Sequence, residues 1–550
     1  MKSFIAALVQ TILVSLAIIF TAFLIPTPLF CILILVLVPL ALLIRWLVFK
    51  KNKGTIFLTV FSIIALLFFA LCLESNPYTF SSGLSKKGNE DMQRGFDSLT
   101  ASQAMNDLDF VMHRVKKIHP AAYKKLPKTL SREWEKVRDE LEGKKERKEE
   151  ISKIELAQKI EGILSLLNDA HTNVSFSFVD SRYLKHVYAH TKAKDTLISV
   201  NGKTKREIFE ENRKLFSTEN DEYAISRIGN YVTSIEGLTY LNLVPESLPI
   251  TELFDEETAE KIDAEFAPAY TYTFEHVDGS VETYAYPLSD FVSYDEYMAF
   301  NSSDSSEEES EKEESQPSSF VHYEINAEDS IGIFTLDSCI FNDVYKSTLK
   351  SFFDEVKEKK IRNLIVDLRN NAGGNSLVAN EFLRYLAVDQ YKECASDLRM
   401  GPFTSHLSPG SVTNEKYEGY SFDGQIYVLT SVQSFSSAMM FAMYIQDNGL
   451  GKVAGEASGN NPSSYGDVVS FRLPESRLYM QVSWKKWYRI DESKEGQLIE
   501  PDIPVKADGA LSHVIELIAG PKIPPVPTDY AENEIPRSEN PENTIPEDQN

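Results

Sequence analysis

The sequence predicts an α/β protein in which N-terminal transmembrane helices and a helical subdomain precede a parallel-sheet α/β core. Three observations predict it. The first 74 residues are mostly apolar, residues 101–180 have a helical pattern with charged runs, and short apolar runs alternate with amphipathic segments after residue 320. Such alternation is typical of parallel strands that are joined by crossover helices.

The N-terminal region predicts three membrane spans within residues 1–74. No charged residue occurs from Ser3 to Ile44, and these 42 residues would form a helix of roughly 63 Å, about twice the thickness of a bilayer core. Two prolines near the middle divide the stretch into spans at about 4–26 and 29–49, and a third span covers 54–73. The lipid bilayer is therefore an expected partner.

The basic residues of segment 45–53 predict the orientation of these spans. Basic loops face the cytoplasm, so everything after Leu73 should be extracytoplasmic in a multi-pass protein of the cell membrane. The more distant basic residues within 86–94 favour the opposite orientation weakly. A cleaved signal peptide is the alternative, but three successive long spans do not fit a short apolar region.

The charge and the cysteine content of the chain exclude some classes of binding partner. The chain has 81 acidic against 56 basic residues and a net charge of −25, so nucleic acid is not an expected partner. The chain has only four cysteines, too few to indicate a fold held together by disulfide bonds. The spacing of its cysteines and histidines does not indicate a zinc site.

The rest of the chain divides by composition and pattern. Segment 195–216 is predicted as a strand, an Asn-Gly turn and a strand leading to a helix, and segment 269–288 as a hairpin around Asp-Gly. The predicted regions are a linker at 75–100, a helical subdomain at 101–180, a mixed β/α region at 181–300, an acidic disordered insert at 301–319, the α/β core at 320–517 and a disordered tail at 518–550.

The α/β core is predicted from six consecutive segments. Strands are expected where short runs are apolar and β-branched, and helices where apolar residues recur at helical spacing. The predicted elements are strands at 330–337, 363–368 and 425–431, and helices at 344–360, 376–387 and 437–447.

The serine-rich stretch "SVQSFSS" (431–437) raises the question of a nucleophile. Ser436 lies where a buried strand leads into a helix, at the edge of a parallel sheet where α/β folds bind ligands. The free N–H groups of a helix N-terminus can stabilise an oxyanion there. The alternative is that the serine only caps an ordinary core helix, and in isolation this is the commoner case.

A glycine loop and a histidine are the other candidate site features. "LIVDLRNNAGGNS" (364–376) is a buried strand followed by Gly373 and Gly374, which can aim backbone N–H groups into a cavity or form a plain turn. His171 lies at a predicted helix-to-strand switch, where a lone histidine is more often a structural hydrogen-bonding residue. Sequence spacing does not show whether it meets Ser436.

The combined motifs resemble the tail-specific (C-terminal-processing) peptidase superfamily of serine hydrolases. The resemblance covers roughly residues 100–516 without the acidic insert. Four segments carry it in the right order: "LIVDLRNNAGGNS", "SVQSFSSAMMFA", "KVAGEASG" (452–459) and "IEPDIPV" (499–505). It implies a crotonase-like core and a serine-type peptidase that acts on peptides or proteins without metal or other cofactor. The predicted spans would anchor this peptidase in the membrane.

The resemblance also implies the site residues. One branch of the superfamily uses a Ser/Lys dyad with the lysine about 25 residues after the serine, and no lysine lies in "GNNPSS" (459–464). The branch that resembles the tricorn core protease has a histidine in an Asp-x-His-Thr context, which "NDAHTN" (168–173) supplies. The implied residues are Ser436 as nucleophile, His171 as base, Glu495 as the residue that orients the base, and the amides of Ser437 and Gly373 or Gly374 as the oxyanion hole.

Several departures from the family pattern leave alternatives open. Met439 occupies a position that is often acidic, and "QLIE" replaces a glycine before the Pro-Asp signature, so that Glu492 is an alternative to Glu495. Ser434 and Ser437 are alternative nucleophiles. Segment 195–216 is compatible with a degenerate PDZ-like module. A catalytically inactive peptide-binding protein on the same fold is the alternative function, and the oligomeric state is not predicted.

Overall fold

The structure, a computed structural model, describes residue 60 and residues 97–175, 181–244, 270–303, 320–401 and 403–520. The three predicted spans at 1–74, most of the predicted linker, nearly all of the acidic insert and most of the predicted tail lie outside the described residues. Within the described ranges, no helix combines the length and the apolar character needed to cross a bilayer.

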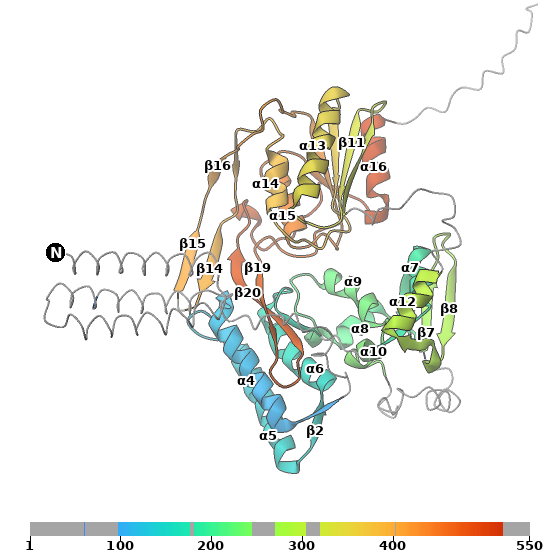
Figure 1. Cartoon of the computed structure of the whole chain (residues 1–550), viewed down its shortest axis with the longest axis vertical. Coiled ribbons are helices and arrows are strands. Elements are labelled where there is room, and N and C mark those ends of the chain that lie inside the picture. Colours follow the sequence, from blue (N-terminus) through green and yellow to red (C-terminus); the bar gives the residue numbers. More distant parts are fainter. Residues whose placement is uncertain are drawn as a thin grey trace, which may run out of the picture.

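A six-stranded sheet forms the centre of the predicted core (Figure 1). The edge strand β10 pairs antiparallel with β11, and all other neighbours are parallel, as the alternating pattern predicts. In spatial order the strands are β10 (Val321–Asn326), β11 (Ile331–Leu336), β12 (Asn363–Asp367), β17 (Gln425–Thr430), β18 (Lys452–Gly455) and β21 (Ile503–Pro504).

Helices cover both faces of this sheet. Successive residues of a strand point to opposite faces, and Leu364 and Val366 pack on one side while Ile365 packs on the other. The Leu364 side is covered by α13 (Asp343–Glu358), α14 (Leu377–Leu383) and α15 (Ser437–Asp447), and the Ile365 side by α16 (Ala507–Ala519).

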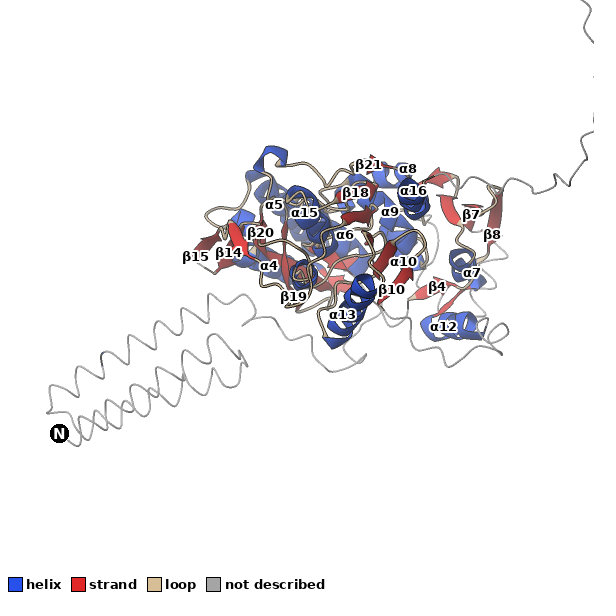
Figure 2. Cartoon of the chain, turned by 90° about the horizontal axis from the view of Figure 1, so that it is seen from above, coloured by secondary structure: helices blue, strands red, loops and turns tan. Residues whose placement is uncertain are grey.

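A second sheet connects the core to the helical subdomain. Its strand order is β15-β14-β20-β19, and the short strand β3 pairs antiparallel with β20. These strands are β3 (Asn173–Ser175), β14 (Ser396–Met400), β15 (Phe403–Leu407), β19 (Tyr465–Arg472) and β20 (Tyr479–Trp487), and a small pair is formed by β13 (Gln390–Lys392) and β16 (Ser411–Thr413). Viewed from above, β14 and β15 lie at the opposite end of the molecule from β7 and β8 (Figure 2).

The helical subdomain begins with a well-capped helix. The Thr100 side chain accepts from the backbone of Gln103, whose own side chain accepts from the Thr100 backbone. The elements here are β1 (Ser98–Thr100), α4 (Ala101–Ile118), α5 (Lys128–Arg147), β2 (Glu150–Ser152) and α6 (Lys153–Leu164), and β1 pairs with β2. Three helices thus account for most of the described residues between 101 and 164.

The mixed β/α region contains the predicted Asn-Gly turn and Asp-Gly hairpin. A four-stranded antiparallel sheet has the order β6-β5-β7-β8, and β4 pairs with β9. The bounds are β4 (Arg182–Leu184), α7 (Val187–Lys192), β5 (Thr196–Val200), β6 (Lys203–Thr204), α8 (Lys205–Glu211), α9 (Asp221–Tyr231), α10 (Ile235–Tyr240), β7 (Tyr270–Glu275), β8 (Val281–Tyr286), β9 (Phe291–Ser293) and α12 (Tyr294–Ser303). Its likeness to a PDZ module stays a prediction.

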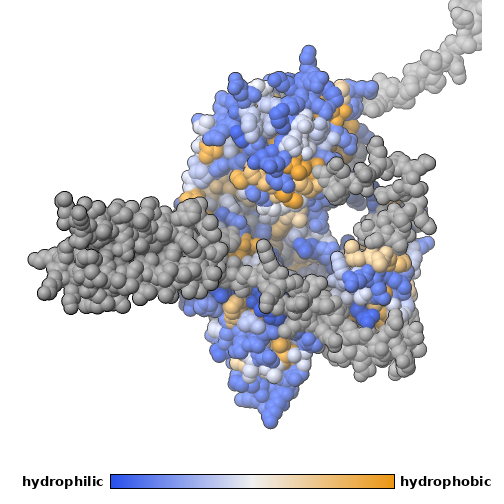
Figure 3. Space-filling view, viewed as in Figure 1, coloured by the Kyte–Doolittle hydropathy of each residue, from blue (hydrophilic) through white to orange (hydrophobic). Residues whose placement is uncertain are grey.

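The molecule is hollowed between the α/β core and the helical subdomain. The space-filling view shows this recess, and hydrophobic side chains gather on the part of the core that borders it (Figure 3). The hairpin of β19 and β20 runs from the core along the helical subdomain (Figure 1). Residues from both parts can therefore meet at this recess.

Candidate active site

Ser436 stands directly before α15 in a backbone conformation that few residues adopt. Its φ is 53° and its ψ is −118°, and a positive φ is uncommon for a residue with a Cβ. It occupies the N-cap position, yet its side chain makes no capping hydrogen bond. The geometry therefore differs from that of an ordinary capping serine, and the sharp turn presents the Ser436 hydroxyl at the carboxyl edge of the sheet.

The two alternative serines have structural hydrogen bonds instead. The hydroxyl of the fully buried Ser434 donates to the Leu368 carbonyl at 2.7 Å and accepts from the Ser431 amide at 3.0 Å. The hydroxyl of Ser437 donates to the Gly374 carbonyl at 2.8 Å. Both hydroxyls hold the loops around Ser436 in place.

The glycine loop packs closely against the turn at Ser436. Gly373 has a φ of 100°, and a Cβ at this position would lie 2.7 Å from the Ser436 Cβ and 2.8 Å from the Phe435 carbonyl oxygen. The buried Asn371 shapes the loop, because its side chain accepts from the Gly373 amide at 2.8 Å and donates to the Leu336 carbonyl at 2.7 Å. Only glycine fits at position 373.

These contacts decide which backbone amides can face a reacting carbonyl. The Gly373 amide is bound by Asn371, and the Ser436 amide donates to the side chain of Asn460 at 2.7 Å. Within the described part of the chain, no hydrogen bond occupies the amide of Gly374 or that of Ser437. Of the expected oxyanion-hole residues, Gly374 and Ser437 therefore keep a free donor, whereas Gly373 provides the close packing.

Strand pairing brings His171 to the same place from far away in the chain. Only Thr172 separates His171 from the start of β3. This strand pairs with β20, where Val174 lies opposite Met480. The Thr172 hydroxyl also accepts from the Ser483 amide at 2.9 Å. The added strand thus fixes the loop of the helical subdomain that contains His171 against the second sheet.

Ser436 and His171 line the same cavities. One cavity of about 400 Å³ is bordered by both residues and by Gly374, Ser437 and Asp467. A second cavity of about 430 Å³ also contains both residues and extends towards the helical subdomain. The structure therefore brings together the predicted nucleophile, the predicted base and two of the predicted oxyanion donors.

The imidazole of His171 is buried without a strong hydrogen bond. Its Nδ1 lies 3.7 Å from Asp169 Oδ1, its ring is 4.7 Å from the ring of Phe435, and neither ring nitrogen has a hydrogen-bond partner among the described residues. Burial lowers the pKa of His171, and the negative charges of Asp169 and Asp467 oppose this only in part. The backbone of Tyr465 acts in the same direction as these charges without reaching hydrogen-bond geometry. A neutral imidazole of this kind can accept a proton.

A second histidine holds Asp169. The Nδ1 of the fully buried His119 accepts from the Ala121 amide at 3.1 Å, so its proton is on Nε2, which lies 3.1 Å from Asp169 Oδ2. Asp169 Oδ1 in turn accepts from the His171 amide at 2.9 Å. Burial raises the pKa of Asp169, but the hydrogen bond from His119, together with interactions with His171 and Thr172, outweighs it, so that the pKa lies below its usual range.

Comparison with known proteins agrees with this geometry. Residues 330–505 match the family model described as peptidase family S41. Over this segment the chain resembles the tail-specific superfamily of serine peptidases. It is accordingly a serine-type peptidase.

Solved structures match this chain at low sequence identity, and one of them has a TM-score above 0.5. The peptidase is similar to a CPAF mutant with a TM-score of 0.51 and 14% identity, over 77% of this chain and 97% of that one. The photosystem II D1 C-terminal processing protease matches with a TM-score of 0.40 and 12% identity, over 76% of this chain and 97% of that one. The tricorn protease matches with a TM-score of 0.31 and 12% identity, over 76% of this chain and 37% of that one.

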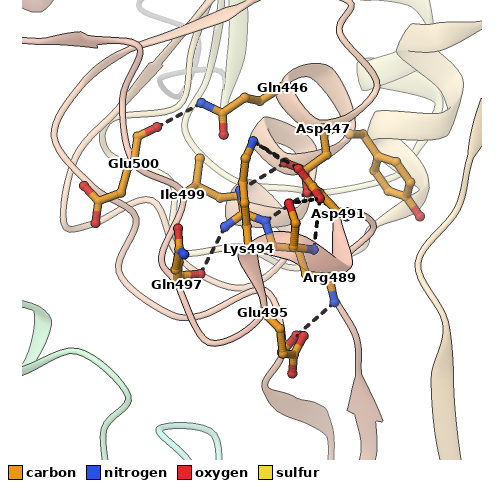
Figure 4. A network of polar contacts seen from close by, with 12 residues as sticks. Gln446, Asp447, Arg489, Asp491, Lys494, Glu495, Gln497, Ile499 and Glu500 are labelled. Carbon is orange, nitrogen blue, oxygen red and sulfur yellow. Dashed lines mark hydrogen bonds and ion pairs between the residues drawn. The ribbon is translucent and has the colours of Figure 1, made fainter.

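Glu495 of the peptidase lies in a loop that does not reach His171 by a hydrogen bond. Its carboxylate accepts from the Ser463 hydroxyl, and the alternative residue Glu492 is exposed. Figure 4 shows the loop beside a buried ion pair between Arg489 and Asp447, with both nitrogen–oxygen distances 3.0 Å. The described contacts thus place Asp169, and not Glu495, next to His171.

Other residues at the site were not expected as functional from the sequence. Asp467 has a φ of 55° within β19 and forms an ion pair with Lys485, and both line the smaller cavity. Asn460 accepts from the Ser436 amide. Asp169 is part of the Asp-x-His-Thr motif, so its position two residues before His171 was a signal that could have indicated it.

Proposed function

We propose that this peptidase hydrolyses peptide bonds with Ser436 as nucleophile and His171 as general base. The observation that carries the proposal is that both residues line two shared cavities, with the Ser436 hydroxyl presented by a strained turn. The neighbouring serines have hydroxyls that are already hydrogen-bonded, which favours Ser436 over them.

The reaction follows from the groups around the cavity. His171 takes the proton of the Ser436 hydroxyl as the oxygen attacks the scissile carbonyl, and the resulting oxyanion accepts from the amides of Gly374 and Ser437. The protonated His171 then gives its proton to the leaving amine, which leaves an acyl ester on Ser436. Water, deprotonated by His171, hydrolyses the ester and restores both side chains.

We further propose that Asp169 orients His171, rather than the expected Glu495. Asp169 lies 3.7 Å from the imidazole and binds the His171 amide, whereas the carboxylate of Glu495 is bound by Ser463. The His119 bond keeps Asp169 ionised in a buried place, so its charge can stabilise the imidazolium that forms during the reaction.

The predicted spans support the further proposal of a membrane-anchored, extracytoplasmic enzyme. Three uncharged stretches of span length lie within residues 1–74, and a basic cluster separates the second from the third. If this is right, the full chain stays in the membrane fraction after alkaline carbonate washing. External protease should then cleave the region after residue 97 in intact cells, and the proposal is wrong if that region is cleaved only after lysis.

The decisive assay measures cleavage of an unstructured protein such as casein by the full-length chain. Ser436→Ala and His171→Ala should each lower kcat/KM by at least about 10³-fold. The matched control Ser434→Ala should keep most of the activity, even where it lowers the melting temperature. Equal activity in Ser436→Ala and wild type would refute the assignment, and no activity in any variant or in wild type would support an inactive peptide-binding protein.

A further inference from the structure

The proposed base His171 and two neighbouring carboxylates form a cluster that the hydrolytic mechanism does not need in full. Asp169, His171 and Glu219 each offer one nitrogen or carboxylate oxygen, and these three atoms lie within 4.8 Å of one another. Asp169 and His171 come from the loop before β3, and Glu219 comes from the loop before α9. The cluster therefore joins the helical subdomain to the mixed β/α region beside the catalytic cavity.

The polar atoms that face this cluster have unsatisfied bonding capacity. Glu219 Oε1 and both ring nitrogens of His171 are buried and have no hydrogen-bond partner among the described residues. Buried polar atoms without partners are uncommon, and a bound ion is one of the standard reasons for them. Here three such atoms belong to two side chains of one small cluster.

The cluster also lacks a fixed positive charge. In the described part of the chain, no lysine or arginine forms an ion pair with Asp169 or Glu219, and Asp169 is fully buried. Two carboxylates in a poorly solvated place repel each other, and a bound cation would relieve this repulsion.

The remaining oxygens of both carboxylates are already held in place. Glu219 Oε2 accepts from the Ala170 amide at 3.3 Å, and Asp169 Oδ2 is 3.1 Å from His119 Nε2. Hydrogen bonds of this kind orient metal-binding carboxylates in known sites. Of the other two oxygens, Glu219 Oε1 has no hydrogen-bond partner among the described residues, and Asp169 Oδ1 accepts from the His171 amide at 2.9 Å and keeps a second lone pair.

From these observations we propose that Asp169, His171 and Glu219 bind a divalent cation of the Zn²⁺ class that inhibits the peptidase reversibly. One imidazole nitrogen with two carboxylate oxygens suits Zn²⁺, whereas Mg²⁺ and Ca²⁺ prefer oxygen ligands alone. With ligand bonds of about 2.0–2.2 Å, the donor atoms need to be about 3.4 Å apart. Cation binding therefore requires the donor atoms, which lie within 4.8 Å of one another, to approach more closely.

Inhibition follows from the nitrogen that the cation would occupy. Nδ1 is the ring nitrogen on the side of Asp169, so a cation between them leaves the proton of the neutral imidazole on Nε2. A protonated Nε2 cannot accept the proton of the Ser436 hydroxyl. This step rests on the proposed function, but binding of the cation does not, and hydrolysis itself does not require the cation.

The test measures Zn²⁺ binding separately from activity. Calorimetric titration with Zn²⁺ uses the full chain with Ser436→Ala, alone and combined with Glu219→Gln or with Glu222→Gln. Glu222 is a matched control, because it is exposed and pairs with Arg206. Glu219→Gln should weaken the tightest site by at least about tenfold, whereas Glu222→Gln should leave it unchanged.

Activity measurements then connect the site with inhibition. Wild type should lose casein cleavage on adding Zn²⁺ and regain it with EDTA, and Glu219→Gln should need at least about tenfold more Zn²⁺ for the same loss while keeping its activity in EDTA. Equal Zn²⁺ binding, or equal Zn²⁺ sensitivity, in the Glu219→Gln and Glu222→Gln variants would overturn the proposal. Absence of cleavage in EDTA would instead refute the proposed function, since calorimetry does not depend on activity.

Discussion

Among individual residues, the close packing of the glycine loop explains how the Ser436 turn keeps its conformation. A backbone in a sparsely populated region costs about 1–3 kcal/mol and persists only where its surroundings fix it. Here the Asn460 side chain binds the Ser436 amide, and Gly373 lies directly against the Ser436 Cβ. The turn, the glycine loop and the free amides therefore form one unit.

Gly373→Ala should lower the activity of the enzyme by displacing the turn at Ser436. A Cβ would lie 2.7 Å from the Ser436 Cβ, so the turn has to shift, and we expect kcat/KM to fall by roughly 10²-fold. Gly410→Ala is the control, because Gly410 also has a positive φ, 64°, but no atom lies within 4 Å of its added Cβ. Casein cleavage with thermal melting of both variants checks this. Equal activity of the two would show that the packing at Gly373 is unimportant.

The two candidate carboxylates can be separated by isosteric amides. Asp169→Asn removes the charge beside His171, and we expect kcat to fall by about 10³–10⁴-fold. Glu495→Gln should change kcat by less than about tenfold, because it alters only an exposed hydrogen bond to Ser463. Steady-state kinetics on variants with unchanged circular dichroism checks both. The reverse order of effects would restore Glu495 as the orienting residue.

Among the secondary-structure elements, the loop after β20 is fixed by one buried ion pair. Arg489 binds both oxygens of Asp447 at the end of α15, and its other nitrogen donates to the carbonyls of Gln497 and Leu498 at 3.2 and 2.9 Å. The two charged side chains are 1% and 0% exposed. This contact ties the loop that contains Glu495 to the helix that begins beside Ser436.

Arg489→Met should therefore be strongly destabilising. It leaves the buried Asp447 with only the partly exposed Lys494 as a countercharge, which costs about 3–5 kcal/mol in the free energy of unfolding. Lys494→Met is the control, since Lys494 is 40% exposed and 3.6 Å from the same carboxylate, and it should cost less than about 1 kcal/mol. Urea unfolding of the purified chain measures both. Similar midpoints for the two variants would contradict the importance of the buried pair.

For the molecule as a whole, stability should depend on pH through Glu161. This carboxyl group in α6 is buried and accepts from the amides of Val174 and Ser217, and burial raises its pKa from 4.5 to about 8. The folded state thus holds a proton that the unfolded state loses near pH 4.5. The stabilisation is complete below that pH and is lost as the pH rises to about 8.

Glu161→Gln should flatten this dependence, because the variant has no proton to lose. Melting temperatures between pH 5 and 8 would fall less in the variant than in wild type. Glu140→Gln serves as the control, since the hydrogen bond from Lys159 lowers the pKa of Glu140 and its removal acts in the opposite direction. Parallel curves for wild type and Glu161→Gln would contradict the assignment.

Local patterns predicted the core elements well, whereas contacts between distant segments needed the structure. The apolar run before Ser436 and the helical spacing after it fix β17 and α15, so the strand-to-helix turn was predictable. The approach of His171 depends on β3 pairing with β20, two segments about 300 residues apart, which no local pattern contains. Likewise, the bond between Glu495 and Ser463 depends on the tertiary fold of two loops.

The most direct test of the central claim is labelling of the full chain with a fluorophosphonate, followed by peptide mapping in a mass spectrometer. The account predicts one phosphonyl group on Ser436 and a labelling rate at least about 10²-fold lower in His171→Ala, because the hydroxyl then lacks its base. Labelling of Ser434 or Ser437, or an unchanged rate in His171→Ala, would contradict it.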